Sequence, residues 1–482
     1  MAHLFYWLYG LTPKALFSNE SVRYNVAPLS ALFRKFFRRL TPAHSLAMSF
    51  IIVISLGTFF LSFPISVAHG KLAFLDALFT ATSATCVTGL VVVDTGTTFS
   101  QFGQIIVLIL IQIGGIGIIT FSTYFAYLVI GKLSVREHVI AEQALGRGPF
   151  PKIGRLFVTI VSSTFIIEAI GAVILFFAFL QYWPSPKAAY LAVFHSISAF
   201  CNAGFSLFSN SLENYHGDII INVTVMSLII IGGMGFWVFV DLKNVLGPRR
   251  FRALTVHSRI VLKMTFSLLL IGSLAILIFE WNNALKDFSP ANKCLAAAFQ
   301  ATTTRTAGFN TVPINGLTNG TLFLMMILMM IGASPGSCGG GIKTTTFAVL
   351  IAMISSKLKD EKQVRLSNRG IPDSIVSKAI SIAFFWLVAV TVAVMALLIS
   401  QHPGSVHEQG RTLFLEATFE AFSAMGTVGL TTGLTPTLSA VGKVLIVLLM
   451  YMGRIGPVTM ALAVMQKRQS GMRLAEEKIL VG

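Results

Sequence analysis

Four glycines in polar surroundings are the residues of this 482-residue chain whose types and spacing point most directly to chemistry. Each follows a short, half-apolar segment and precedes a bulky apolar residue. Glycine adopts backbone angles that a side chain blocks, so it allows consecutive carbonyl oxygens to point at one axis. A ring of such oxygens can replace the water shell of a dehydrated cation. The four positions are Gly89, Gly204, Gly308 and Gly429.

The agreement between the four segments extends beyond these glycines. A hydroxyl residue stands six positions before each one, and a second glycine follows 24 to 28 residues later within a long apolar stretch. Small residues in membrane helices can serve close packing alone, but four aligned copies favour a filter. The hydroxyl residues are expected to fix backbone groups of the loops, and they are Ser83, Ser198, Thr302 and Ser423.

Each predicted filter strand ends on its glycine. The short helix before the strand ends near the pore centre, where the partial negative charge of a helix C-terminus favours a cation. No ring of carboxylates occurs at this place in the sequence, which favours a monovalent ion over Ca²⁺ or Mg²⁺. The residues predicted to bind the ion are Val87, Thr88 and Gly89, then Asn202, Ala203 and Gly204, then Thr306, Ala307 and Gly308, and finally Thr427, Val428 and Gly429.

A second group of glycines interrupts the apolar stretch 320–356. A continuous helix there would lose about 1 kcal/mol for each glycine and about 3 kcal/mol for the proline. The sequence therefore predicts a break below the third filter strand, either a mobile loop that gates the pathway or a passive kink. The predicted gate residues are Gly332, Ser334, Pro335, Gly336, Gly339, Gly340, Gly341, Lys343 and Arg454.

Arg454 lies deep in the last apolar stretch, where the first two repeats have Gly115 and Gly233. An ionisable residue at that depth is a functional candidate by default. We expect it to limit ion flow through its charge or to be held by carbonyl groups of the gating loop, and the two roles are compatible. Glu168 is expected to pair with a polar group inside the bundle, and Glu280 to lie at the outer interface.

The composition requires a membrane. Hydrophobic residues make up 55% of the chain and charged residues 11%, whereas a soluble protein has about 25% charged residues. Apolar runs of about 20 residues match a hydrocarbon layer of about 30 Å. The Lys and Arg residues follow the positive-inside rule and predict cytoplasmic termini, and they indicate contact with the lipid bilayer and not with nucleic acid. Of these 36 residues, 28 fall in the segments 1–45, 131–156, 241–263, 343–378 and 467–482.

These observations predict an all-α polytopic membrane protein with four pseudo-symmetric helix–pore loop–helix repeats around a single central pore. Four short segments cannot cross a membrane by themselves and are expected to dip in and return, lining water or protein. They are residues 73–86, 187–201, 291–305 and 410–426. The predicted units are a cytoplasmic segment 1–45, repeats 46–130, 156–240, 258–356 (with a broken second helix) and 374–466, and a cytoplasmic tail 467–482.

Four stretches resemble the Trk/Ktr/HKT superfamily of K⁺ transporters, in particular the membrane subunit of bacterial Ktr systems. They are TSATCVTGLVVVDTGTTFS, TTRTAGFNTV, GASPGSCGGGIKTTTF and GRIGPVT, and the resemblance covers the chain from about residue 46 onward. It implies a homodimer in the membrane with one pore in each subunit, a gating loop, and K⁺ as the substrate ion. Glycine in all four filter loops goes with K⁺ selectivity in this family, whereas some plant relatives with serine at the position of Gly89 pass Na⁺.

The resemblance also implies a partner and a location. The chain has neither a GxGxxG motif after a strand nor a soluble segment long enough to bind a nucleotide, so ATP or ADP would act through a separate cytosolic ring subunit. No covalently bound cofactor is expected, Na⁺ is considered as an activator, and the location is the bacterial inner (plasma) membrane. The alternative is a Na⁺-coupled K⁺ symporter or another secondary transporter for Na⁺ or ammonium. An intramembrane enzyme has no support from paired acidic, His or Ser–His residues.

Overall fold

The computed structural model describes residues 42–117, 153–246, 254–367, 369–401 and 411–456. Most of this part of the chain is helical, and its two strands, β1 (Arg365–Leu366) and β2 (Arg369–Gly370), form a short antiparallel hairpin. The predicted all-α class is therefore confirmed. The predicted tail 467–482 and nearly all of the predicted segment 1–45 lie outside the described residues.

Four units of a long helix, a short pore helix and a second apolar helix make up the bundle, and each pore helix matches its predicted segment to within two residues. The first unit contains α3 (Pro42–Leu61), α4 (Phe74–Thr85) and α6 (Gln101–Ile116), and the second contains α9 (Ile153–Phe179), α10 (Ser185–Phe200) and α11 (Ile219–Met234). The third contains α13 (Val256–Glu280), α14 (Pro290–Thr303) and α15 (Asn319–Met330), and the fourth contains α17 (Asp373–Gln401), α18 (Arg411–Gly426) and α19 (Ala440–Ile455).

The second helix of every unit begins in the same way. A Ser, Thr or Asp precedes the helix, and its side chain accepts a hydrogen bond from the backbone N–H three residues later. Such a cap satisfies one of the N–H groups that a helix start leaves without a partner. The four capping residues are Ser100, Asp218, Thr318 and Ser439.

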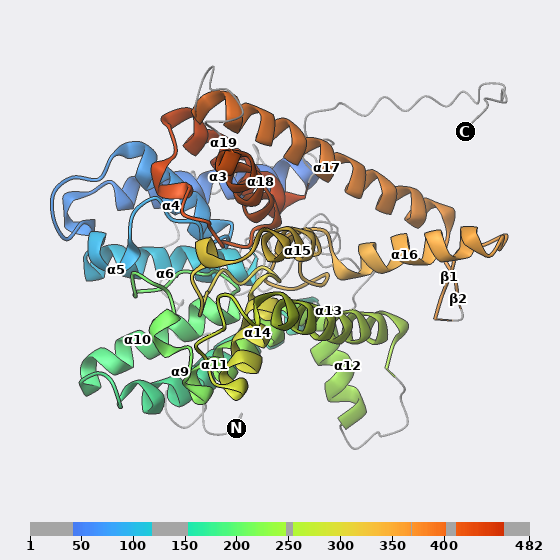
Figure 1. Ribbon diagram of the computed structural model, residues 1–482, viewed down its shortest axis with the longest axis horizontal. Helices are drawn as coiled ribbons and strands as arrows, with labels where there is room; N and C mark the ends of the chain where they lie inside the picture. Colours follow the sequence, from blue (N-terminus) through green and yellow to red (C-terminus); the bar gives the residue numbers. More distant parts are fainter. Residues whose placement is uncertain (1–41, 118–152, 247–253, 368, 402–410, 457–482) are drawn as a thin grey trace, which may run out of the picture.

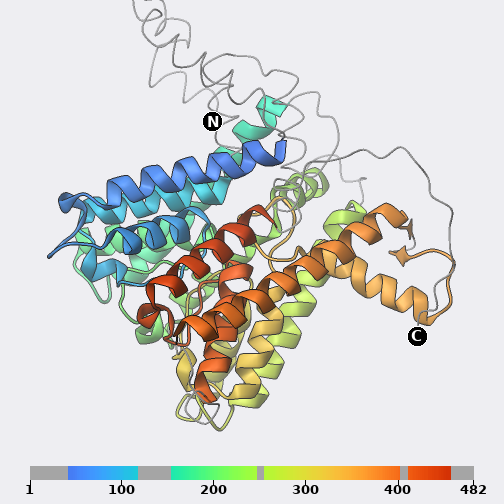
Figure 2. The same ribbon diagram turned by 90° about the horizontal axis from the view of Figure 1, so that it is seen from above.

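Short elements fill the connections. They are α5 (Thr95–Thr98) and the 3-10 turns η3 (Pro64–Ser66), η4 (Glu213–Tyr215), η5 (Ile314–Gly316) and η6 (Thr435–Thr437). Two more helices, α12 (Phe236–Leu246) and α16 (Thr344–Leu358), continue the second and third units. Figure 2 shows α16 and α17 extending away from the rest of the bundle, with the β1–β2 hairpin at their far end.

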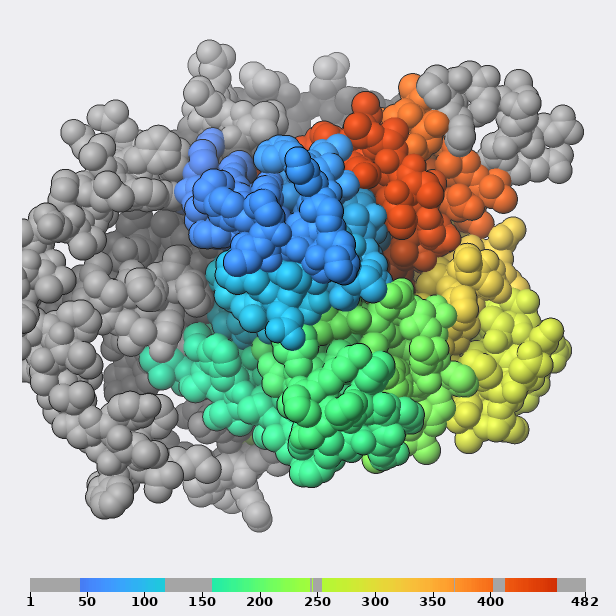
Figure 3. All heavy atoms as spheres, turned by 90° about the vertical axis from the view of Figure 1, so that its left-hand side faces the viewer, coloured from blue at the N-terminus to red at the C-terminus, as the bar shows by residue number. Residues whose placement is uncertain are grey.

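The four units close into a ring. The second helix of each unit contacts the pore helix of the next, in the pairs α6–α10, α11–α14, α15–α18 and α19–α4. Figure 1 shows the units following one another in blue, green, yellow and red around a common centre. In Figure 3 they occupy adjacent sectors of one face. The predicted pseudo-symmetric arrangement around a single centre is therefore confirmed.

Four of the described helices are long and apolar enough to cross a membrane, namely His44–Leu61, Val158–Phe179, Val256–Glu280 and Asp373–Gln401. They are the first helices of the four units, and their outward faces expose large apolar side chains, as lipid contact requires. Phe177 is 64% exposed, Phe266 68%, Phe384 62% and Ile399 68%. These exposed apolar faces support the multi-pass arrangement predicted from the composition, because a soluble bundle would have polar residues there.

The second helices differ from the sequence expectation. The apolar sequence over 103–130, 218–240 and 440–466 predicts one continuous span in each stretch, but α11 and α12 form a bent pair with an angle of 95° between them. The break is at Gly235, whose φ of 88° is not helical and whose place a side chain could not take, since a methyl group there would lie 2.5 Å from the carbonyl oxygen of Pro335. Likewise α6 and α19 end at Gly117 and Gly456, with φ of 89° and 93°. The remainder of those two spans lies outside the described residues.

Candidate ion pathway

Each pore helix leads into a strand with an unusual backbone. The residue two before the glycine and the glycine itself have positive φ, and the residue between them does not. This alternation turns successive carbonyl groups to one side, as a ring of ion ligands needs. Positive φ is a rare conformation for β-branched residues and is found at functional sites. The φ values are 56° and 96° for Val87 and Gly89, 59° and 71° for Asn202 and Gly204, 67° and 80° for Thr306 and Gly308, and 51° and 94° for Thr427 and Gly429.

The four glycines touch one another through a closed ring of carbonyl groups. A methyl group on any of them would collide with the carbonyl oxygen that precedes the glycine of the next strand. It would lie 2.5 Å from the oxygen of Ala203 if built on Gly89, 2.9 Å from that of Ala307 on Gly204, and 2.6 Å from that of Val428 on Gly308, and on Gly429 it would overlap the oxygen of Thr88. All twelve predicted filter residues are thus brought together, and their binding of an ion stays a prediction.

The hydroxyl residues behind the strands do what was expected in two repeats. Ser83 and Ser423 each accept a hydrogen bond from the N–H of the filter glycine, both at 3.1 Å. In the second repeat Ser198 donates to the carbonyl of Phe205 at 2.7 Å, so it fixes the strand from beyond the glycine. In the third repeat Thr302 bonds to Ala298 within its own helix, and the expectation was wrong there.

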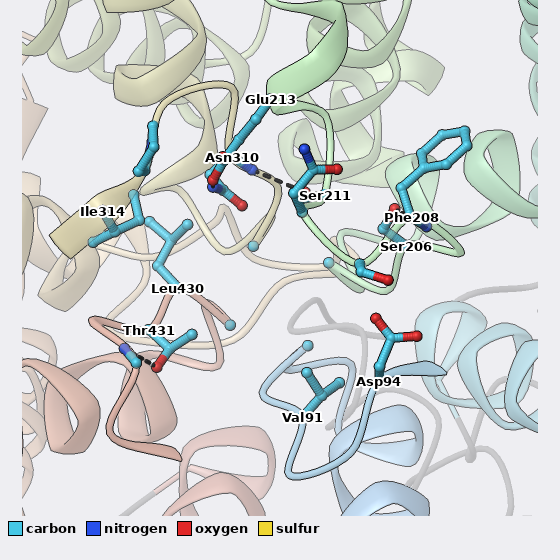
Figure 4. A pocket seen from close by; sticks show the side chains of 18 of the residues that line it. Val91, Asp94, Ser206, Phe208, Ser211, Glu213, Asn310, Ile314, Leu430 and Thr431 are labelled. Atoms are coloured by element: carbon cyan, nitrogen blue, oxygen red, sulfur yellow. Dashed lines mark hydrogen bonds between the residues drawn. The ribbon is translucent and has the colours of Figure 1, made fainter. Parts of the chain in front are cut away.

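A cavity of about 420 Å³ opens on one side of the ring. All four filter glycines line it, together with the acidic residues Asp94 and Glu213 (Figure 4). None of the described residues that line it is Lys or Arg. Burial raises the pKa of Glu213, against the effect of a 2.6 Å hydrogen bond from the Asn310 amide. The mouth therefore offers a cation a space directly before the ring that is lined by acidic side chains and large enough to hold water.

The predicted break between α15 and α16 lies on the opposite side of the ring, in direct contact with it. The backbone N–H of Gly340 donates to Thr427 Oγ1 at 3.1 Å. A methyl group on Gly339 would overlap Thr306 Oγ1, and one on Gly340 would overlap Thr427 Oγ1. The loop of residues 331–343, which we call the gating loop after its predicted role, therefore lies against the third and fourth filter strands.

The gating loop is held by backbone groups of the second repeat. Ser334 N–H donates to the Gly233 carbonyl at 3.0 Å, and Cys338 N–H donates to the Gly232 carbonyl at 3.2 Å. In return, Phe236 N–H donates to the carbonyl of Gly336 at 3.0 Å. The glycines are needed for this fit. Gly332 packs on Gly340 and Gly341 without room for a larger side chain, and Gly336 has a φ of 70° and packs closely on Trp237. Pro335 takes the place that Gly235 and its equivalents hold in the other repeats.

Two basic residues hold the loop from its own end and from α19. Lys343 Nζ donates to the carbonyl of Gly339 at 2.6 Å. Arg454 donates through one nitrogen to the carbonyl of Cys338 in the loop and through the other to the carbonyl of Gly114 at the end of α6. These contacts support the expectation that carbonyl groups hold the guanidinium. The expected effect of its positive charge on ion flow stays a prediction.

Several polar residues have places that the sequence did not reveal. Glu168 does pair inside the bundle, with Gln112 Nε2 at 3.1 Å. Glu280, the last residue of α13, is fully buried and accepts from Thr318 N–H at 2.9 Å, and its place at the outer interface stays a prediction. His195 and Glu420 had not been singled out, although both stand nine positions before a filter glycine and are fully buried in pore helices. A search for polar residues at that offset would have found them.

Comparisons with known proteins decide the family. The family model described as TrkH, cation transport protein, matches residues 30–474. The chain belongs to this family. The Ktr system potassium uptake protein B of Bacillus subtilis is 37% identical over 446 residues, which cover 92% of this chain and 97% of that protein. The potassium/sodium uptake protein NtpJ of Enterococcus hirae is 34% identical over 450 residues, covering 92% and 98%.

A solved structure agrees with the arrangement of the helices. The crystal structure of the potassium transporter TrkH from Vibrio parahaemolyticus matches with a TM-score of 0.70, covering 87% of this chain and 83% of that one. At 18% sequence identity this likeness shows the fold. Membership in the TrkH family confirms that the chain is a multi-pass membrane transporter and not an enzyme.

Proposed function

We propose that this chain takes up K⁺ through the ring formed by its four filter strands. The observation that carries the proposal is the closed contact between the strands, in which each glycine lies against the carbonyl group of the next strand. Backbone carbonyls without charged side chains suit a monovalent cation. The relatives named for potassium uptake, at 37% and 34% identity over nearly their whole lengths, support the same ion.

In this proposal the gating loop closes the cytoplasmic side of the ring. The contacts of Gly339 and Gly340 with the filter strands, and the hydrogen bonds of Arg454 and Lys343 to the loop, support a closed state. Opening would withdraw the loop from Thr306 and Thr427. The whole assembly is a homodimer in the bacterial plasma membrane with both termini in the cytoplasm, and a cytosolic ring that binds ATP or ADP controls the loop.

Coupling to Na⁺ is the second candidate. The relative from Enterococcus hirae is named as a potassium/sodium uptake protein, and this favours Na⁺ as an activator or a co-transported ion. A channel-like pathway and a symporter differ in whether K⁺ moves down its own gradient without Na⁺. Rb⁺ influx into K⁺-loaded liposomes, with and without Na⁺, separates the two.

The filter itself is tested by selectivity. Gly89→Ser and Gly308→Ser place a side chain against the neighbouring strand's carbonyl, so the preference for Rb⁺ over Na⁺ flux should fall by about tenfold or more, equivalent to at least 1.4 kcal/mol. Gly70→Ser is the matched control, since Gly70 also has a positive φ, of 77°, but has no atom within 4 Å of an added Cβ. Unchanged selectivity in both filter variants would refute the proposal.

A further inference from the structure

The residue two positions after the filter glycine is a hydroxyl in the second and fourth repeats only. There it is Ser206 and Thr431, whereas the other two repeats have Val91 and Asn310. Both hydroxyl residues line the cavity at the mouth of the ring, and Figure 4 shows them on opposite sides of it. The order of contacts around the ring also places the second and fourth strands diagonally across from each other.

Both hydroxyls are bound in the same way from behind. Ser206 Oγ lies 3.0 Å from His195 Nε2 and accepts from Phe208 N–H at 3.0 Å. Thr431 Oγ1 donates to Glu420 Oε1 and accepts from Gly433 N–H at 2.9 Å. In each case the partner behind the hydroxyl stands nine positions before the filter glycine, and the N–H in front of it stands four positions after.

The direction of these bonds follows from their partners. His195 Nδ1 lies 2.8 Å from the carbonyl of Leu191, which can only accept, so Nδ1 carries the hydrogen. In the neutral ring Nε2 is then an acceptor, and Ser206 must donate to it. The neutral ring is the form that suits His195, which is fully buried and stacks on Phe208 with ring centres 4.8 Å apart. Glu420, as a carboxylate, accepts from Thr431 in the same sense.

One lone pair is left on each hydroxyl. A hydroxyl oxygen has one hydrogen to donate and two lone pairs to accept. In Ser206 and Thr431 the hydroxyl hydrogen is donated to His195 or Glu420, and one lone pair accepts from a backbone N–H. Since both residues line the cavity, we infer that the second lone pair is available there. A hydroxyl held in this way presents negative charge to the mouth and cannot turn its hydrogen toward an incoming cation.

We propose that Ser206 Oγ and Thr431 Oγ1 form an outer cation site in front of the filter, where K⁺ is held with part of its water shell before it enters the ring. The site deepens the proposed K⁺ function and rests on it. The cavity of about 420 Å³ has room for an ion with its water, since a water molecule occupies about 30 Å³. His195 and Glu420 are positioning residues, because they fix the direction of the hydroxyls without touching the ion.

The outer site is tested by measuring K⁺ uptake in a bacterial host that lacks its own K⁺ uptake systems, because the external K⁺ concentration can then be set. Ser206→Ala and Thr431→Val should each raise the half-saturating K⁺ concentration about three- to tenfold, with the maximal rate and the K⁺/Na⁺ preference unchanged. Ser206→Thr and Thr431→Ser keep the hydroxyl and should keep the affinity. Ser209→Ala is the control for an exposed hydroxyl that lines the same cavity.

A second pair of variants tests the direction of the hydroxyls. His195→Phe removes the acceptor and puts in the residue that the third repeat has at this offset, Phe299, so Ser206 can turn its hydrogen to the mouth and the affinity should fall as in Ser206→Ala. Glu420→Gln keeps an acceptor oxygen and tests the charge. If His195→Phe fails to reach the membrane, Ser206→Ala and Thr431→Val still decide.

The outcomes separate the outer site from the filter. Unchanged half-saturation in Ser206→Ala and Thr431→Val would refute the outer site, and so would a loss of K⁺/Na⁺ preference in place of affinity, since the hydroxyls would then act through the filter backbone. Gly89→Ser serves in the same host as the test of the filter. If it loses selectivity while the hydroxyl variants change nothing, the outer site fails and the proposed function stands. If both Gly89→Ser and Gly308→Ser keep selectivity, the proposed function fails.

Discussion

Removing the guanidinium of Arg454 should open the pathway. Arg454 donates to the carbonyl of Cys338 in the gating loop and to that of Gly114 in α6. Only the first of these bonds has to break when the loop withdraws, because Gly114 belongs to the ring of helices. A hydrogen bond to a charged group contributes about 1.5–3 kcal/mol. Its loss in Arg454→Gln should therefore raise the ratio of open to closed states about 10- to 150-fold.

The assay is Rb⁺ influx into K⁺-loaded liposomes that contain the chain without any partner, where the closed state should dominate. Lys443→Gln is the matched control, since it removes a cation from the same helix, one that pairs with Asp76 at 2.6 Å. Its influx should stay within about twofold of the wild type, because this largely buried pair joins α19 to α4 and includes no residue of the gating loop. Influx through Arg454→Gln that equals the wild type, at equal protein content, would refute the reasoning.

Arg454→Lys separates the two roles of the arginine. Lysine keeps the positive charge beside the pathway, but its single ammonium group cannot reproduce the fork that reaches Cys338 and Gly114 together. If the hydrogen bond to the loop keeps the pathway closed, Arg454→Lys should conduct as Arg454→Gln does. If the charge alone limits the flow, the lysine variant should stay as slow as the wild type.

Three further predictions concern the loop and the fold. Gly340→Ala places a methyl group against Thr427 Oγ1 and should raise Rb⁺ flux. Gly316→Ala, with open space around the added methyl group, should not change the flux. Equal flux in both variants would mean that the loop is a passive kink. Gly235→Ala should lower the free energy of unfolding by about 1–3 kcal/mol more than Gly70→Ala does. Both glycines have positive φ, but only Gly235 meets the carbonyl of Pro335. Equal losses of stability, measured by thermal unfolding in detergent, would contradict this. Glu280→Gln should destabilise the chain by about 1–2 kcal/mol, because an amide nitrogen would face Thr318 N–H or Asn283 Nδ2. The K⁺/Na⁺ preference of this variant should not change, and an altered preference would mean that Glu280 acts on the filter.

The repeats and the pore helices could be predicted because their signals are local. A short segment, a hydroxyl and a glycine at fixed offsets suffice to place α4, α10, α14 and α18 to within two residues. Apolar length alone was a poorer guide to the second helices. The bend at Gly235 lies against Pro335, about a hundred residues further along the chain. Its local signal is a glycine three positions after Gly232, which recurs as Gly117 and Gly456 and is visible only when the repeats are compared.

The polar residues behind the filter were missed for a related reason. His195 meets Ser206, and Glu420 meets Thr431, across eleven residues and a change of direction in the backbone. A polar residue in an apolar pore helix says nothing by itself about its partner. The signal was present only in comparison, since a polar residue nine positions before the glycine occurs together with a hydroxyl two positions after it in the second and fourth repeats and not in the other two.

The differences between the repeats explain how a ring of four similar units can carry a single loop against its filter strands. The gating loop belongs to the third repeat. It donates hydrogen bonds to the carbonyls of Gly232 and Gly233 in the second repeat and to Thr427 in the fourth. Arg454, also of the fourth repeat, ties it to Gly114 of the first. A ring of four identical chains would offer four such loops competing for one axis, and none could cross it. Because the four units belong to one chain, all four can keep the filter backbone while the third alone carries the proposed gating loop.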